Sequence, residues 1–327
     1  MSSTPGRPAS ARRWILPLIW LVLTVALILL ARPLPWSRAL TEMRHLSPVW
    51  VAAAMIANAA ILPLWALEWK LLVPGGVRVT CTRMFEVVTV TASVLNSVPL
   101  LAGEASAVAL LITRANLSRG AALSVLAMDQ ILVAFAKLAV IAAALMLTPL
   151  PQWVRSGGLT LVLVLTASLA LLVPLAHFWL PLRERLLAAP TRARRLAAAA
   201  AAWGRHFDVL RDASTLWRVA ALAVIKKSTE LAAIICVQVA FGLEPSVATG
   251  VLVLAALALS TLVPVAPANL GVYEATVFGI YRLAGIPTET AIGLALIQHL
   301  CFLVPSLGTG YLLLTMRQLR PEPLSAS

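Results

Sequence analysis

The chain has 327 residues, of which 61% are hydrophobic and only 12% are charged, and its mean hydropathy is +0.92. This composition excludes a soluble globular domain, because several apolar runs approach or exceed the roughly 20 residues that cross a bilayer as a helix. The net charge of +13 does not indicate a nucleic-acid partner, because the basic residues lie in short segments between apolar runs. The sequence therefore predicts an all-α, polytopic integral membrane protein with a single membrane domain over residues 1–327.

Six apolar runs are predicted to be full membrane spans. They cover residues of about 14–31, 49–67, 121–147, 159–180, 218–241 and 287–316. The first run follows a short basic segment and resembles a signal peptide, but no A-x-A cleavage site follows it, so we interpret it as a span. The segment of about 34–46 is predicted to form an amphipathic helix on the outer surface.

Two further apolar stretches, about 84–113 and 249–284, are each interrupted by Pro, Gly, Asn and Glu. Non-helical backbone at membrane depth is tolerated only where it is buried in protein or lines a cavity. We therefore expect two broken or re-entrant helical hairpins. The predicted helix breaks are Pro99, Gly103, Pro264, Pro267 and Gly271.

The distribution of basic residues predicts that both termini are cytoplasmic. Lys and Arg follow the second span, precede the span 121–147 and fill the connector of about 181–217, whereas the segments 149–158 and 242–249 carry one charge each. In this orientation the hairpins enter from opposite sides, so the halves of about 14–147 and 159–316 form an inverted repeat. The connector is interpreted as a solvated amphipathic helix against the inner leaflet; the alternative is a patch that gathers anionic lipid.

Polar side chains inside the apolar runs are the candidate translocation residues, because charge at membrane depth is by default a functional-site hypothesis. Glu104 and Glu274 hold matching positions in the two hairpins, and their alternative role is to cap a half-helix. Asn96 and Asn269 are expected to bond the backbone freed at the breaks. The full candidate set is Asn96, Glu104, Asp129, Gln130, Lys137, Lys226, Lys227, Glu230, Asn269, Glu274 and His299.

The span 218–241 carries three of these charges. Lys226 and Glu230 lie four residues apart and are expected to pair with each other. Lys227 then remains for Glu274, for the glutamate of the first hairpin or for an anionic lipid. The alternative is that both lysines reach the cytoplasmic head groups.

The span 121–147 carries Asp129, Gln130 and Lys137. The last two lie seven residues apart, so they are expected to share a stripe that faces the bundle interior. A proton relay through Asp129 or His299 is an alternative to a packing role for these residues.

No catalytic motif accompanies these charges. The sequence has no H-E-x-x-H, no G-x-S-x-G and no pair of aspartates in apolar runs. Its three cysteines are far apart and odd in number, so they indicate neither a disulfide framework nor a metal cluster. We therefore expect no cofactor, no metal and no enzymatic activity.

The two interrupted stretches contain related motifs. The first holds an Asn and a Pro followed by Gly-Glu, at Asn96, Pro99, Gly103 and Glu104; the second matches L-P-x-x-P-G-G-x-G-x-x-E at Val263, Pro264, Pro267, Leu270, Gly271, Val272 and Glu274. These motifs resemble the flippase-like membrane domain of lysylphosphatidylglycerol synthases, which also occurs in stand-alone proteins, including a subgroup associated with hopanoid biosynthesis. Two positions depart from the family: Ala268 and Asn269 replace a glycine pair, and Asp129-Gln130 replaces an acidic residue followed by Arg.

The resemblance implies a flippase that moves a lipid with a polar or anionic head group between the leaflets of a bacterial cytoplasmic membrane. A lipid-biosynthesis enzyme is a candidate partner, and no nucleic acid is expected to bind. One alternative is a non-catalytic accessory protein of a lipid, hopanoid or cell-envelope glycan pathway; another is an intramembrane lipid-modifying enzyme. The embedded charges favour transport, because an accessory role needs the apolar bulk but no central charges.

Overall fold

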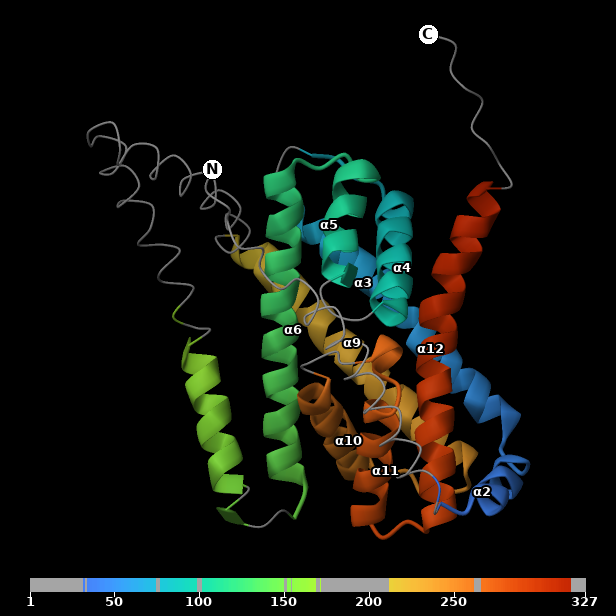
Figure 1. The fold of residues 1–327 in the computed structure, drawn as a ribbon. Helices are drawn as coiled ribbons and strands as arrows, with labels where there is room; N and C mark the ends of the chain where they lie inside the picture. Colours follow the sequence, from blue (N-terminus) through green and yellow to red (C-terminus); the bar gives the residue numbers. More distant parts are fainter. Residues whose placement is uncertain are drawn as a thin grey trace, which may run out of the picture.

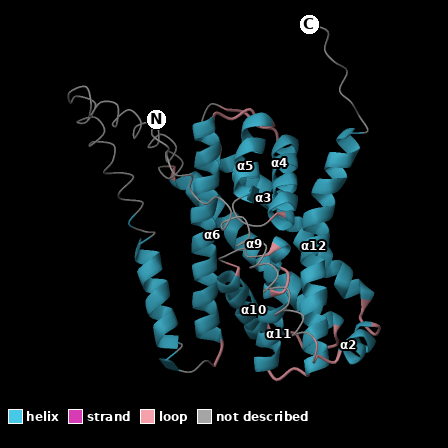
Figure 2. Ribbon diagram, in the orientation of Figure 1, coloured by secondary structure: helices cyan, strands magenta, loops and turns pink. Residues whose placement is uncertain are grey.

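The computed structural model describes most of the chain. The described residues are 32, 34–74, 77–98, 102–149, 152–153, 155–168, 171, 212–261 and 266–318. The predicted span of about 14–31, most of the connector of about 181–217, Pro99 and Pro264 lie outside them. Within the described residues every regular element is a helix, as the sequence predicts (Figure 2).

Four long helices form the frame of the bundle. They are α3 (Pro48–Leu72), α6 (Arg119–Leu147), α9 (Ala213–Ala240) and α12 (Thr288–Gln318). Helices α3, α6 and α12 are long and apolar enough to cross a membrane, whereas α9 has 28 residues but carries Arg218, Lys226, Lys227 and Glu230. A shorter helix, Arg155–Ser168, covers the start of the predicted span 159–180.

Side-chain caps explain where three of the helices begin. The oxygen of Ser118 accepts the backbone N–H of Ala121 at the start of α6, and Asp212 accepts from Ser214 at the start of α9. Ser246 does the same for α10 (Val247–Ser260). Such a cap satisfies one of the unpaired amide groups in the first turn of a helix.

Each interrupted apolar stretch folds as two short helices that pack against each other. The first hairpin consists of α4 (Cys81–Ser97) and α5 (Ala102–Thr113); the second consists of α10, the short 3-10 helix η2 (Pro267–Asn269) and α11 (Val272–Leu283). At 1.5 Å per residue these arms are about 18 to 26 Å long, which is less than the roughly 30 Å of a bilayer core. The prediction of two broken helical hairpins is confirmed.

The two hairpins lie at opposite ends of the bundle (Figure 1). Hairpin α4–α5 lies at the top beside the end of α3 and the start of α6, and hairpin α10–α11 lies at the bottom beside the start of α12. Their inner ends meet, because η2 packs against α4. Helices α3 and α9 pack along each other more extensively than any other pair of described helices.

The apolar core contains two large clusters, one around each hairpin, and a small third cluster of Ala144, Val251 and Ala255. The first includes Trp69 of α3, Met84 of α4 and Met128 of α6. The second includes Val253 of α10 and Leu294 of α12. Because each hairpin has its own core, the polar groups that lie between the hairpin tips are held by two well-packed bodies.

The predicted amphipathic helix of about 34–46 is present as α2 (Trp36–Met43). It packs against α12, and Arg38 forms an exposed ion pair of 3.4 Å with Glu289 near the start of that helix. An exposed ion pair contributes about 0 to 1 kcal/mol, so the apolar contacts of α2 fix its position more than this pair does.

Candidate functional site

A polar cavity of about 270 Å³ lies where the tips of the two hairpins meet. Helices α3, α4, α6, α9, α10, η2, α11 and α12 all contribute to its wall. Its polar lining residues are Asn58, Asn96, Lys137, Lys227, Glu230, Thr261, Asn269, Tyr273 and Gln298. Five of these were predicted as translocation residues, so the structure brings together Asn96, Lys137, Lys227, Glu230 and Asn269.

The charges in the cavity do not balance. The Nζ atom of Lys227 donates to both carboxylate oxygens of Glu230, at 2.8 and 2.6 Å. Within the described residues Lys137 has no hydrogen-bond or ion-pair partner, so the cavity holds one cation more than anions. A cation without a partner in a half-buried site favours a ligand that brings negative charge.

The predicted pairing of Lys226 with Glu230 is wrong. Lys226 points instead to α3, where its Nζ atom lies 2.6 Å from the Oε2 atom of Glu68, and Lys227 takes Glu230. Residues three apart on a helix are neighbours as much as residues four apart. The contact of Lys226 with Glu68 of α3 therefore leaves Lys227 as the partner of Glu230.

The two asparagines of the hairpin tips behave differently. The Nδ2 atom of Asn96 donates to the carbonyl of Ala92 at 2.8 Å, one turn earlier in α4, so it bonds helical backbone and not the backbone freed at the break. The expectation for Asn269 is wrong, because its Oδ1 atom is buried without a hydrogen-bond partner among the described residues. An unpaired buried acceptor costs about 1 to 3 kcal/mol, so a hydrogen-bond donor on a ligand would be favoured there.

The backbone of the second tip turns through left-handed conformations. Ala268 and Asn269 both have φ of 53°, and Gly271, which precedes α11, has φ of 83°. Glycine adopts such angles without steric cost, whereas alanine does not. The break that the sequence predicts at Pro267 and Gly271 therefore includes a strained residue between them.

Glu274 supports the second tip and does not reach the cavity lysines. Its Oε2 atom accepts the N–H of Gly271 at 2.7 Å, and its Oε1 atom lies 2.7 Å from Nδ1 of His299 on α12. The ring of Tyr273 stacks on that histidine with ring centroids 4.0 Å apart. The predicted pairing of Lys227 with Glu274 is wrong, and the capping alternative describes the contacts of Glu274.

Glu104 occupies the matching place in the first hairpin, in the first turn of α5. Its Oε2 atom is buried, and no partner lies within hydrogen-bond distance among the described residues. Gly103 allows α5 to approach α4 closely, because a Cβ atom at this position would overlap the side chain of Leu95. The two glutamates thus share a position but not their contacts.

A second buried polar group lies between α3, α6 and α9. Its acids are Glu68 and Asp129; Asp129 accepts the indole N–H groups of Trp65 and Trp69 at 2.9 and 2.8 Å. Sequence reasoning missed Glu68 because it placed the end of the span at residue 67. The apolar residues 71–73, which continue beyond Lys70, were the signal that the helix extends further.

The expected stripe of Gln130 and Lys137 is wrong. Lys137 lines the cavity, whereas Gln130 is exposed and its Nε2 atom lies 3.4 Å from the Oδ2 atom of Asp129. A spacing of seven residues drifts by about 20° on a straight helix.

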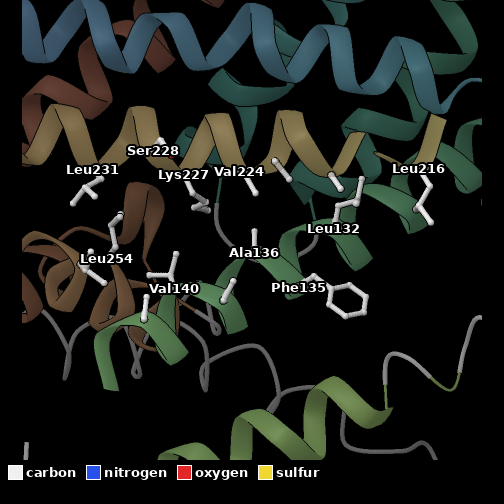
Figure 3. A pocket seen from close by; sticks show the side chains of 15 residues that line it. Leu132, Phe135, Ala136, Val140, Leu216, Val224, Lys227, Ser228, Leu231 and Leu254 are labelled. Carbon is white, nitrogen blue, oxygen red and sulfur yellow. The ribbon is translucent and has the colours of Figure 1, made fainter. Parts of the chain in front are cut away.

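An apolar groove of about 560 Å³ adjoins the cavity. Side chains of α6 and α9 face each other across it, and Leu254 of α10 lies toward one end (Figure 3). Lys227 and Ser228 are its polar lining residues. Lys227 and Leu254 line both the groove and the cavity, so the two spaces meet at these residues.

Comparison with known protein families matches residues 17–310 to the family described as lysylphosphatidylglycerol synthase TM region. No curated protein matches the chain.

Proposed function

The chain belongs to the lysylphosphatidylglycerol synthase TM region family of membrane proteins, and we propose that it moves a polar or charged lipid between the two leaflets of a bacterial cytoplasmic membrane. The observation that carries this proposal is the polar cavity joined to an apolar groove through Lys227 and Leu254. A lipid is amphipathic, so a protein that carries it needs one space for the head group and another for the tails.

The head group is assigned to the cavity. Lys137 provides a cation without a protein partner, and Asn269 provides a buried acceptor without a donor. The tails are assigned to the groove between α6 and α9, whose lining is apolar apart from Lys227 and Ser228. Lys227 stands at the junction, where the polar and apolar parts of a lipid also join.

The contacts between helices support an inverted repeat, which would supply two alternate conformations. If α3, α4, α5 and α6 correspond to α9, α10, α11 and α12, the contact of α4 with α12 corresponds to that of α10 with α6. The contact of α5 with α6 likewise corresponds to that of α11 with α12. The extensive contact of α3 with α9 then lies between the two halves, and alternating access would change it.

The charges at the two ends of the bundle support the proposed orientation. Basic residues outnumber acidic ones among the exposed or half-buried residues near the end of α3, the start of α4 and the loop before α6, where Lys70, Arg78, Arg83, Arg114 and Arg119 stand against Glu86. The opposite end mixes both signs at Arg38, Glu42, Glu244, Arg282 and Glu289. By the positive-inside rule, this distribution supports a cytoplasmic position for the first end, and we propose that both termini are cytoplasmic.

The proposal includes no chemical reaction and no cofactor. Head-group recognition, a change of conformation and release are sufficient for lipid movement. A lipid-biosynthesis enzyme that delivers the lipid remains a candidate partner.

The test is lipid movement in proteoliposomes. Purified protein is reconstituted with fluorescent lipids of several head groups, and a membrane-impermeant quencher reports the fraction that reaches the outer leaflet. Lys137→Gln and Lys227→Gln are expected to slow movement by about 10- to 100-fold, because a hydrogen bond to a charged group contributes about 1.5 to 3 kcal/mol.

The matched control is Arg119→Gln, which removes an exposed positive charge from the first turn of α6. It is expected to move lipid at the wild-type rate. Movement of no tested lipid by the wild-type protein would contradict the proposal and would favour the accessory role. Equal loss in the control and in the cavity variants would show that the cavity has no special part.

A further inference from the structure

Three ionisable side chains are buried together at the contact of α3, α6 and α9, outside the cavity assigned to the lipid. Glu68 is fully buried, and its Oε2 atom lies 2.6 Å from Nζ of Lys226, whose side chain is 11% exposed. Asp129 is 2% exposed, and Lys226 acts electrostatically on both acids. The cluster therefore contains two carboxyl groups and one ammonium group away from water.

The charges of this cluster do not balance when both acids are ionised. One buried negative charge would then have no counter-ion, which costs several kcal/mol, and a buried acid in this position takes up a proton instead. The hydrogen bonds indicate which acid does so. Two indole N–H groups satisfy Asp129 as an ionised carboxylate, whereas both carboxyl oxygens of Glu68 are buried without a hydrogen-bond partner among the described residues, and only Oε2 has the ion-pair contact with Lys226.

We propose that Glu68, Lys226 and Asp129 form a proton-binding site, with the exchangeable proton on Oε1 of Glu68, and that its occupancy controls the packing of α3 against α9. The link from this packing to lipid movement rests on the proposed function. The proton comes from the aqueous phase and binds to Oε1 as the ion pair of Glu68 with Lys226 breaks; no other bond changes.

Other charged groups surround this site. From α9, Lys227 also acts on Glu68, but Glu230 holds it in the cavity. From α6, exposed Gln130 lies beside Asp129, with its Nε2 atom 3.4 Å from the Oδ2 atom of that acid. The other helices packed on α3 carry Arg83 and Glu86 on α4, and His299 on α12, which is held by Glu274.

A metal ion does not fit this cluster as well as a proton does. Calcium and magnesium require about six or more oxygen ligands. The described residues contain no group of three or more His, Cys, Asp or Glu side chains that could hold a metal. The ammonium group of Lys226 already contacts Glu68 and would repel a cation there.

Protonation of Glu68 has a structural consequence because the ion pair joins α3 to α9. These helices have the most extensive contact of the described residues, and they belong to different halves of the proposed repeat. When this ion pair is lost, Asp129 of α6 is the one ionised acid of the cluster that still attracts Lys226. The proton therefore changes the relative stability of two packings of the halves, which is how a small local change shifts a conformational equilibrium.

The first experiment measures the proton and does not depend on transport. Infrared spectra of the full chain in lipid nanodiscs are recorded during a pH titration. We expect the carbonyl band of a buried, protonated carboxylic acid to grow as pH falls in the wild type and to be lost in Glu68→Gln. Glu244→Gln, which changes an exposed glutamate, is the matched control and should retain the band.

The absence of this band in the wild type, or its persistence in Glu68→Gln, would overturn the proposal. If Glu68→Gln does not fold, Glu68→Asp replaces it. That variant keeps an ionisable carboxyl group on α3, and a band with the same frequency and the same titration as in the wild type would overturn the assignment of the proton to Glu68.

The second experiment applies a pH gradient to proteoliposomes that contain the wild-type protein and a lipid it moves. If one proton accompanies one lipid, a gradient of one pH unit changes the equilibrium ratio of lipid between the leaflets by about tenfold. In Glu68→Gln the ratio should not respond to the gradient. A wild-type ratio that ignores the gradient would overturn the coupling of the site to transport. Absence of any lipid movement would contradict the proposed function, and the infrared result alone would then decide the proton site.

Discussion

Replacement of Ala268 by glycine should stabilise the protein, although glycine usually destabilises a folded chain. Ala268 has φ of 53° at the tip of the second hairpin, between Pro267 and Asn269. An L-residue in this left-handed region has its Cβ atom too close to the carbonyl oxygen that follows it. Glycine has no Cβ atom and removes that conflict.

The magnitude follows from two opposing contributions. Relief of the left-handed strain contributes about 1 to 2 kcal/mol. The greater freedom of glycine in the unfolded chain costs about 0.5 to 1 kcal/mol. The expected result is a net gain of about 0 to 1.5 kcal/mol in the free energy of unfolding for Ala268→Gly, before the loss of a buried methyl group is considered.

A matched variant separates this effect from the general effect of glycine. Ala221 is exposed in the interior of α9, and Ala221→Gly should lose about 1 kcal/mol. Both variants are compared with the wild type by thermal unfolding in the same detergent, and the unfolding free energies are measured with a denaturant. If Ala268→Gly loses as much stability as Ala221→Gly, Ala268 does not adopt a left-handed conformation in the folded protein.

Two other predictions test the second tip and the orientation. Glu274→Gln should lower the free energy of unfolding by about 2 kcal/mol, because the carboxylate makes charge-assisted contacts with the Gly271 N–H and with His299. Denaturant unfolding in detergent measures this change, and Glu244→Gln is the control. Equal stability of the two variants would show that these contacts contribute nothing. In a chain whose three native cysteines are replaced, Ser156→Cys should react with an impermeant reagent added outside, whereas Ser118→Cys should not, since the segments that hold them are expected on opposite sides. Reaction of Ser118→Cys from outside would contradict the orientation and the inverted repeat with it.

The long helices and the hairpins could be predicted because their causes are local. A run of apolar residues as long as α6 has few stable forms other than a helix in a membrane. The breaks follow from Pro267 and Gly271, which act on their own segment of backbone. The position of the break therefore does not depend on which helix packs beside it.

The ion pairs could not be predicted because they depend on how helices rotate against each other. Lys226 has Glu230 four residues later in its own helix, yet it pairs with Glu68 of α3, which lies 158 residues earlier in the chain. The left-handed angle of Ala268 was also not predictable from its side chain. The sequence shows only that a glycine of the family is missing at this position. The backbone shows that the residue there adopts a left-handed angle, which glycine adopts without steric cost.

The adjacent lysines of α9 connect the two polar sites of the protein. Neighbouring residues on a helix are about 100° apart around its axis and 1.5 Å apart along it. Lys226 therefore contacts the acid of α3, while Lys227 contacts the acid that lines the cavity. Because the backbone of α9 joins both, a rotation of α9 that moves Lys226 away from Glu68 would also move Lys227 relative to the cavity that we propose for the head group. Two sites that would otherwise need a chain of intermediate contacts thus share a single helix, and the charge state of one can alter the geometry of the other.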